Sequence, residues 1–238
     1  MPNIKQSVAV MQPYIFPYIG YFHLIEASDK FIIYDDVNYS KKSWINRNRI
    51  LLNKTDFLFT IPTLKASQNK LINDIHTNID DKWKHKFLTQ IEYAYKKSPY
   101  YNQIIKLIEE TINIESTSIV DLCIKSIEVV YTYLNLEFNY TKSSNLSPET
   151  KGIKKEDRLI QITKKLHSET YINAIGGKAI YNKTYFKTNG IELLFIKSKL
   201  NEYEQFNNDF ISGLSIIDVL MFNDKPQIIK HLKNFTLD

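Results

Sequence analysis

Two short apolar runs with a helical pattern between them constrain the fold of this chain more than any other feature. The first run covers residues 8–10, the second covers 31–34, and residues 21–27 carry apolar side chains at spacings that suit one helix face. Uninterrupted apolar runs are typical of strands that are buried on both faces of a parallel sheet. The pattern therefore predicts a strand–helix–strand unit, and ligands bind such sheets at the edge where the strands end.

The loop after the first predicted strand should be stiff, because it holds two of the chain's seven prolines, Pro13 and Pro17. Proline fixes its own φ and disfavours helical backbone at the preceding residue, so we expect Gln12 and Phe16 to be extended. Gly20 permits close approach of the backbone to a neighbour or a ligand. The predicted ligand-binding residues of this segment are Gln12, Phe16, Gly20 and Tyr21.

Paired carboxylates, Asp35 and Asp36, end the second apolar run. They are candidates to accept a proton, bind a metal or hydrogen-bond a ribose, and equally to cap a helix or pair with Arg47 or Arg49. Alternation along a strand places the two arginines on one face, where their fork-shaped donors suit phosphate oxygens. The predicted anion-binding and ring-binding residues of this stretch are Lys42, Trp44, Asn46, Arg47 and Arg49.

His23 and Cys123 are reactive side chains with different expected roles. His23 lies on the predicted helix next to the stiff loop, where an imidazole serves either as a general base near neutral pH or in a structural role. Cys123 lies in an apolar helical stripe and is expected to be a small core residue rather than a nucleophile. The five histidines include no pair at helical or strand spacing, so we predict no zinc site.

The remaining patterns alternate between helix and strand. We expect a hairpin of strands 49–52 and 57–62, a mobile loop over 63–70, helices within 80–113 and a further helix from Ser116 or Thr117. We also expect strands at 136–141, 170–174 and 191–196, and an apolar helix at 214–221 capped by Ser212 or Ser215. This order predicts an α/β fold with a doubly wound, mostly parallel, Rossmann-like sheet. Residues 1–238 should form one domain, with the hairpin and helices inserted at about 46–113.

Small residues directly follow two of these predicted strands. Ser143 and Ser144 come after the strand at 136–141, where hydroxyl groups can donate to a ligand. Gly176 and Gly177 follow the strand at 170–174, and adjacent glycines there indicate close approach of the backbone to another group. We therefore expect all four residues to contribute to ligand binding.

The charge and the cysteine content exclude several classes of protein. The net charge of +5 is spread along the chain without a dense basic run, which permits an acidic ligand but favours no nucleic-acid surface. One cysteine excludes an internal disulfide framework. No run of about 18 apolar residues indicates a membrane helix, and the first residues do not resemble a signal peptide. We expect a cytoplasmic protein without membrane insertion.

Several longer motifs are similar to those of one family. They are MQPYIFPYIGYF at 11–22, DKFIIYDDVNYSKKSWINRNRI at 29–50, RL at 158–159, YINAIGGKAIY at 171–181 and FISGLSIIDVLMFN at 210–223. These motifs resemble the WbqC-like proteins, which are found with bacterial O-antigen and surface-polysaccharide biosynthesis. The resemblance implies transfer of a glycyl or other acyl group onto an amino sugar, usually a nucleotide-linked deoxy sugar.

A remoter similarity concerns the loop after the first strand. The strand, the QPYIFPYIGY loop and the helix look like the strand, HxGH loop and helix of the nucleotidyltransferase and pantothenate synthetase superfamily. When the glycines are aligned, Tyr18 and Tyr21 stand where that motif has histidines. The similarity therefore implies the architecture but not adenylyl transfer.

The leading chemical hypothesis is amide formation, in which the amine of the sugar attacks an activated acyl group. The donor is expected to be a thioester on coenzyme A or an acyl carrier protein, or else to be formed with ATP; no cofactor is assigned. The predicted catalytic residues are His23, Asp36 and Asp35, with His23 or Asp36 as the base. The predicted oxyanion donors are Gly176, Gly177, Ser143 and Ser144, the phosphate ligands are Lys42, Arg47 and Arg49, and the stacking rings are Phe16, Tyr21 and Trp44.

Two alternatives to this hypothesis stay open. One is a non-catalytic protein of the same pathway that binds a sugar nucleotide or an assembly partner. The other is an ATP-dependent ligase that works through an acyl adenylate and releases pyrophosphate.

Overall fold

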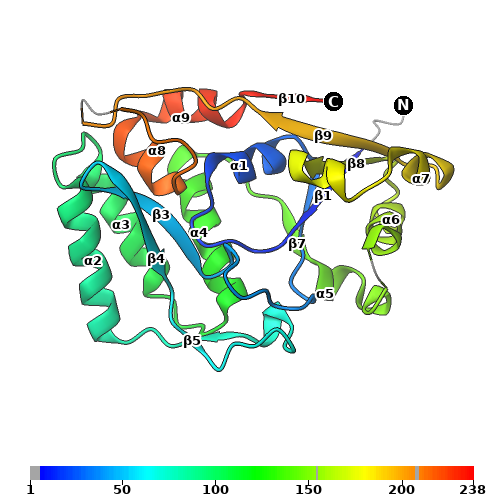
Figure 1. Cartoon of the computed structure of the whole chain (residues 1–238), viewed down its shortest axis with the longest axis horizontal. Coiled ribbons are helices and arrows are strands. Elements are labelled where there is room, and N and C mark those ends of the chain that lie inside the picture. Colours follow the sequence, from blue (N-terminus) through cyan, green and yellow to red (C-terminus); the bar gives the residue numbers. More distant parts are fainter. Residues whose placement is uncertain (1–5, 154, 207–208) are drawn as a thin grey trace.

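A six-stranded sheet forms the centre of the computed structural model, which describes residues 6–153, 155–206 and 209–238 (Figure 1). The strand order is β10-β9-β8-β1-β2-β7, and within this sheet only β10 runs antiparallel to its neighbour. The strands are β1 (Ser7–Met11), β2 (Lys30–Ile33), β7 (Tyr140–Lys142), β8 (Thr170–Ala174), β9 (Glu192–Ser198) and β10 (Phe235–Leu237). The predicted α/β fold with a mostly parallel sheet is confirmed.

The chain fills this sheet from the middle outward. It passes from β1 through β2 to β7 on one side, and then crosses back to β8, β9 and β10 on the other side of β1. The direction of strand addition therefore reverses between β1 and β8. Open α/β sheets bind ligands beside such a reversal, at the carboxyl ends of the strands. The likeness to the nucleotidyltransferase superfamily stays a prediction.

Helices cover both faces of the sheet. They are α1 (Ile19–Glu26), α2 (Asp81–Tyr95), α3 (Tyr101–Ile112), α4 (Ile119–Leu134), α5 (Ser143–Leu146), α6 (Lys155–Lys165), α7 (Lys183–Thr188), α8 (Ile216–Phe222) and α9 (Lys225–Leu232). Ala9 and Phe31 pack in the hydrophobic cluster that includes α1 and α4, whereas Val8 and Ile32 pack in the cluster that includes α6 and α7. Successive strand residues thus face opposite layers, which explains their uninterrupted apolar runs. No helix in the described ranges has both the length and the apolar character to span a membrane.

The hairpin within the predicted insertion is tighter than expected. Its strands are β3 (Arg47–Leu52) and β4 (Thr55–Thr60), joined by Asn53 and Lys54 alone instead of the predicted four-residue link. Both turn residues have positive φ, 51° and 63°. This is the geometry of the two-residue turns whose twist matches that of paired strands. β3 therefore begins two residues earlier than predicted, and β4 begins and ends two residues earlier than predicted.

Residues 63–70, predicted to be a mobile loop, pair with other segments at both ends. The segment begins with β5 (Thr63–Leu64), which pairs with β6 (His76–Thr77). At its other end the carbonyl of Lys70 accepts from the Tyr39 N–H at 2.8 Å. The polar composition of the segment did not indicate this pairing, because the partner residues lie in other segments of the chain.

Several element ends also differ from prediction. α4 begins after Ser118, which caps it, because the side chain of Ser116 hydrogen-bonds Asp121 instead. Ser215 caps α8, which confirms one of the two predicted capping residues. β7 covers only the end of the predicted strand at 136–141, and α9 and β10 had no counterpart in the prediction.

A buried carboxylate joins three parts of the structure outside the sheet. Asp218 on α8 accepts hydrogen bonds from Tyr95 Oη at 2.8 Å, from Tyr203 Oη at 2.6 Å and from Gln205 Nε2 at 2.6 Å. Burial raises the pKa of Asp218. Tyr95 Oη also accepts from the N–H of Leu51, so this network fastens α2, β3 and the segment before α8 together.

Replacing Tyr95 by phenylalanine should destabilise the protein, because it leaves the Leu51 N–H and one Asp218 oxygen without their partner in a buried place. We expect the free energy of unfolding to fall by roughly 1–3 kcal/mol in urea denaturation. Tyr93→Phe on the same helix is the matched control, since Tyr93 is 72% exposed. Equal denaturation curves for the two variants would contradict the role of the network.

Candidate functional site

Residues 12–18 form the loop that leaves the carboxyl end of β1, and side chains from three distant segments hold it. The Phe16 N–H donates to Ser126 Oγ on α4 at 2.9 Å. The Phe16 carbonyl accepts from Asn48 Nδ2 on β3 and from Ser215 Oγ before α8, both at 2.7 Å. Phe16 has a φ of 39°, so its predicted extended conformation is wrong. The left-handed region costs about 1–2 kcal/mol for a residue other than glycine, which these contacts offset.

This loop forms one wall of a pocket of about 260 Å³, which we call the aromatic pocket. Its lining residues are Tyr14, Tyr18, Trp44, Asn48, Arg49 and Gly213. Tyr18 and Trp44 are 37% and 38% exposed, so both rings are accessible to a ligand. The pocket brings together two predicted ligand residues, Trp44 and Arg49, at the carboxyl edge of β1.

Two glycines allow this pocket to form. A Cβ atom on Gly20 would lie 2.3 Å from the ring of Tyr18, so the close approach predicted at Gly20 is made by the chain's own tyrosine. Gly213 has a φ of 68°, which strains any other residue. Its carbonyl accepts from Arg49 Nη2 at 3.2 Å, so the turn at Gly213 also orients the guanidinium group.

Two guanidinium groups lie against the ring of Trp44. The central carbons of Arg49 and Arg47 are 5.5 Å and 5.8 Å from the centre of the indole ring, within the range of cation–π attraction. Arg49 forms an ion pair with Asp56 at 3.0 Å. Arg47 donates to the carbonyls of Ser43 and Lys42, and no carboxylate of the described residues pairs with it. Arg47 therefore supplies a net positive charge beside the pocket.

The two tyrosines of the pocket are suited to donate hydrogen bonds. Burial raises the pKa of Tyr14, with a further contribution from Tyr18, and burial also raises the pKa of Tyr18. Both hydroxyl groups therefore stay protonated at neutral pH. They can donate to an anionic or carbonyl oxygen but cannot accept a proton as a phenolate would.

Asp35 and Asp36 belong to a different site, a buried polar cluster beyond the end of β2. Asp35 accepts from the Ser144 N–H at 3.0 Å and from Ser144 Oγ at 2.6 Å. Ser143 Oγ lies within hydrogen-bond distance of both carboxylates. Asp36 forms an ion pair of 2.5 Å with Arg158, and both side chains are almost fully buried. Asp36 thus pairs with Arg158, and Asp35 is held by Ser143 and Ser144; neither carboxylate pairs with Arg47 or Arg49 as the sequence had suggested.

Arg158 was not among the predicted site residues. It lies on α6 directly before Leu159 and Ile160, and its Nε donates to Thr150 Oγ1 at 3.1 Å. The sequence did offer a sign of this role, because Arg158 lies among the apolar residues of its helix. An arginine buried there requires a carboxylate partner. With Asp36, Ser143 and Ser144 all engaged, the cluster connects β2, α5 and α6.

His23 is packed inside the protein, against α9 and β10. Its Nε2 lies 2.8 Å from the carbonyl of His231, and its ring centre lies 5.8 Å from that of Phe235. Burial lowers the pKa of His23. The contacts that the structure describes link the imidazole to the C-terminal elements, and it does not line the aromatic pocket.

Other predicted ligand residues do not line the aromatic pocket. Phe16, Tyr21 and Asn46 are buried; Tyr21 Oη donates to the Gln12 carbonyl at 2.9 Å, and Asn46 accepts from Tyr39 Oη at 2.9 Å. Gly176 and Gly177 lie in a short 3₁₀ turn after β8, with Gly177 packed against Asn173. Lys42, two residues before Trp44 in the sequence, is exposed. The described residues include no group of three or more metal-binding side chains.

Replacing Arg158 by methionine should leave the Asp36 carboxylate buried and unpaired, which typically costs 3–5 kcal/mol. We expect the free energy of unfolding to fall by about that amount in chemical denaturation. The double variant Asp36→Asn with Arg158→Met should recover part of the loss. Lys165→Met, which removes an exposed ion pair on the same helix, is the control and should have little effect. A fully stable Arg158→Met protein would contradict a structural role for the pair.

Comparison with known proteins places these features in one family. A family model described as the WbqC-like protein family matches residues 12–230, which include the aromatic pocket and the buried cluster. The uncharacterized protein Rv1507c of Mycobacterium tuberculosis is 25% identical over 234 residues, which cover 96% of this chain and 99% of that protein. No solved structure matches the chain. Since the family model spans nearly the whole sequence, the chain belongs to the WbqC-like protein family.

Proposed function

We propose that this protein is an acyl or aminoacyl transferase that forms an amide on the amino group of a nucleotide-linked amino-deoxy sugar in surface-polysaccharide biosynthesis. The acceptor sugar binds in the aromatic pocket. The observation that supports this most is the accessible Trp44 ring, with the guanidinium groups of Arg47 and Arg49 against it. Family membership supports the pathway and the type of reaction through the resemblance of the motifs.

The pocket suits a ring that carries an anionic group. The indole of Trp44 offers a flat apolar surface, and Tyr14 and Tyr18 offer hydroxyl groups for a sugar. At about 260 Å³ the pocket accommodates a sugar ring, while the nucleotide extends outward past Arg47. The charge of Arg47 and its fork of donors suit the diphosphate of such a ligand.

The reaction requires few groups from the protein. The neutral amine of the sugar attacks the carbonyl carbon of an acyl thioester, and a C–N bond forms as the carbonyl electrons move to oxygen. The carbonyl re-forms, the C–S bond breaks, and the thiolate leaves with the electron pair. The proton lost by the attacking nitrogen passes through a base to the thiolate, which gives an amide and a thiol. Donors for the oxyanion and an acceptor for this proton are the two requirements.

The aromatic pocket and the Arg49–Asp56 ion pair beside it offer candidates for both requirements. The protonated hydroxyl groups of Tyr14 and Tyr18 are suited to donate to the oxyanion. Asp56, which contacts Arg49 and is about half exposed, is suited to accept the proton. We place Asp56 in this role because its side chain is accessible and bound to Arg49 of the pocket lining. His23 and Asp36, the bases suggested by the sequence, are buried and do not line the pocket.

One observation favours a second candidate function, the binding of a sugar nucleotide without catalysis. All three residues that the sequence suggested as catalytic, His23, Asp35 and Asp36, are buried and have structural partners. A binding protein needs only the aromatic pocket. Turnover measurements separate this candidate from the transferase.

Trp44→Ala should weaken the binding of uridine-diphosphate amino sugars, because the ligand loses the surface on which its ring stacks. We expect the Kd from calorimetry to rise by about 10-fold, or about 1.4 kcal/mol. The control is Tyr185→Ala, which removes an exposed ring on α7 far from the pocket lining. An unchanged Kd in the Trp44 variant would exclude the aromatic pocket as the acceptor site.

Incubation with a panel of amino-sugar nucleotides and acyl donors, with and without ATP, tests the reaction by mass spectrometry. We expect the sugar to gain the mass of the acyl group with a thioester donor and no ATP. Asp56→Asn should lower kcat by about 100-fold or more while the Kd for the sugar changes little, as expected for a lost general base. Asp81→Asn on α2 is the control. Binding without any product would favour the second candidate, and a strict need for ATP would favour a ligase.

A further inference from the structure

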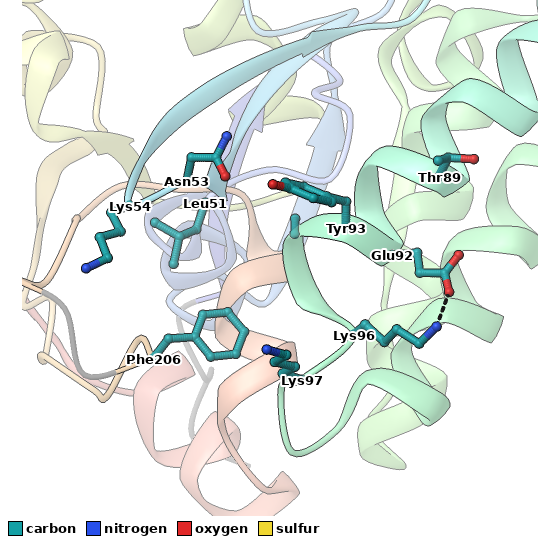
Figure 2. A pocket seen from close by; sticks show the side chains of 10 residues that line it. Leu51, Asn53, Lys54, Thr89, Glu92, Tyr93, Lys96, Lys97 and Phe206 are labelled. Carbon is teal, nitrogen blue, oxygen red and sulfur yellow. Dashed lines mark hydrogen bonds and ion pairs between the residues drawn. The ribbon is translucent and has the colours of Figure 1, made fainter.

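A second and larger hollow lies between the turn of the β3–β4 hairpin and the exposed side of α2, and we call it the α2 hollow. Its volume is about 750 Å³, within the usual range for sites that bind small molecules. Figure 2 shows Leu51 and Lys54 reaching it from the hairpin, Tyr93 from α2, and Phe206 and Lys97 on its lower side. It is large enough for an extended ligand with several chemical parts.

The side chains of the α2 hollow combine positive charge with apolar surface. Lys54, Lys96 and Lys97 line it, against a single carboxylate, Glu92. Glu92 is bound to Lys96 at 2.7 Å, so Lys54 and Lys97 supply the net positive charge. Tyr93 and Phe206 add two rings, and the almost fully buried Leu51 also belongs to the lining. This composition fits a phosphorylated ligand with an apolar arm.

The α2 hollow lies next to the aromatic pocket on the same strand. Arg49 lines the aromatic pocket and Leu51 lines the hollow, and residues two apart on a strand point to the same face, about 7 Å from each other. Asp56 is paired with Leu51 across the hairpin and is bound to Arg49. The Arg49–Asp56 ion pair therefore lies where the two sites meet.

We propose that the α2 hollow binds the phosphopantetheine arm of the acyl thioester, so that donor and acceptor meet beside Asp56. This rests on the proposed transferase function and adds the place and the chemical class of its donor. The phosphate end of the arm contacts Lys54 and Lys97, and the pantetheine part runs past Leu51 toward Arg49. ATP fits less well, since its phosphates are bound with Mg²⁺ and the one carboxylate in this lining is engaged by Lys96.

Calorimetry with coenzyme A tests the donor site without any need for turnover. In Lys54→Ala/Lys97→Ala we expect the Kd for coenzyme A to rise 10-fold or more, while the Kd for the amino-sugar nucleotide stays the same. The control is Lys82→Ala/Lys86→Ala, which removes the same amount of positive charge. Both of these lysines are exposed and lie in the N-terminal half of α2, whereas Lys97 follows its C-terminal end. Thermal melts confirm that both variants are folded.

A comparison of coenzyme A with the smaller probe 4′-phosphopantetheine identifies the source of the arm. If 4′-phosphopantetheine binds as tightly as coenzyme A, the lysines recognise the arm as a carrier protein presents it. If it binds much more weakly, the nucleotide part of coenzyme A is also recognised. Either result supports the proposal.

Three results would overturn it: no binding of either probe, equal Kd values for coenzyme A in the two double variants, or binding of ATP in place of coenzyme A. The two proposals fail separately. Sugar binding without coenzyme A binding removes only the donor site, whereas coenzyme A binding without sugar binding removes the acceptor assignment.

Discussion

The candidate site depends on the unusual backbone at Phe16. Its N–H and carbonyl are both bound by side chains, from Ser126 on α4, Asn48 on β3 and Ser215 before α8. These residues are far apart in the sequence, so one residue after β1 connects the sheet, the hairpin and the C-terminal helices. The same contacts bring Trp44 and Arg49 beside Tyr14 and Tyr18. Any loss at Phe16 would therefore open the pocket and loosen the hairpin together.

The buried cluster of Asp35, Asp36 and Arg158 has a comparable role beyond the end of β2. It joins the end of β2 to α5 and α6, which belong to segments more than 100 residues later. A buried ion pair contributes little net stability relative to apolar residues, but it penalises any arrangement in which one partner is left alone. The cluster thus favours one position of α6 over the sheet.

Local patterns in the sequence predicted the mostly parallel sheet and part of the site. The apolar runs at β1 and β2 are strong signals, because each strand is buried on both faces and no polar alternation interrupts it. Trp44 and Arg49 were predicted from their chemistry, and the structure brings them into one pocket. The place of Tyr14 and Tyr18 in the pocket lining was missed, although each directly follows a proline of the same loop.

The parts of the fold and of the site that the sequence did not predict depend on contacts between distant residues. Nothing near Asp36 in the sequence indicates Arg158, and nothing near His23 indicates the carbonyl of His231 that occupies its ring nitrogen. Phe16 illustrates the same limit, because the bias of the following proline is weaker than three hydrogen bonds from other segments. The turn at Asn53 and Lys54 was predicted to be two residues too long. Neither residue is a glycine, the residue type that usually marks a two-residue turn with positive φ.

The two outer strands of the sheet, β7 and β10, are only three residues long. An edge strand offers its unpaired backbone groups to any passing chain, and a short one offers few of them. Each margin of this sheet is therefore a poor template for a further strand. A crowded solution of this protein should be protected against growth of the sheet from one molecule to the next, even though its inner strands are as apolar as those of aggregating segments.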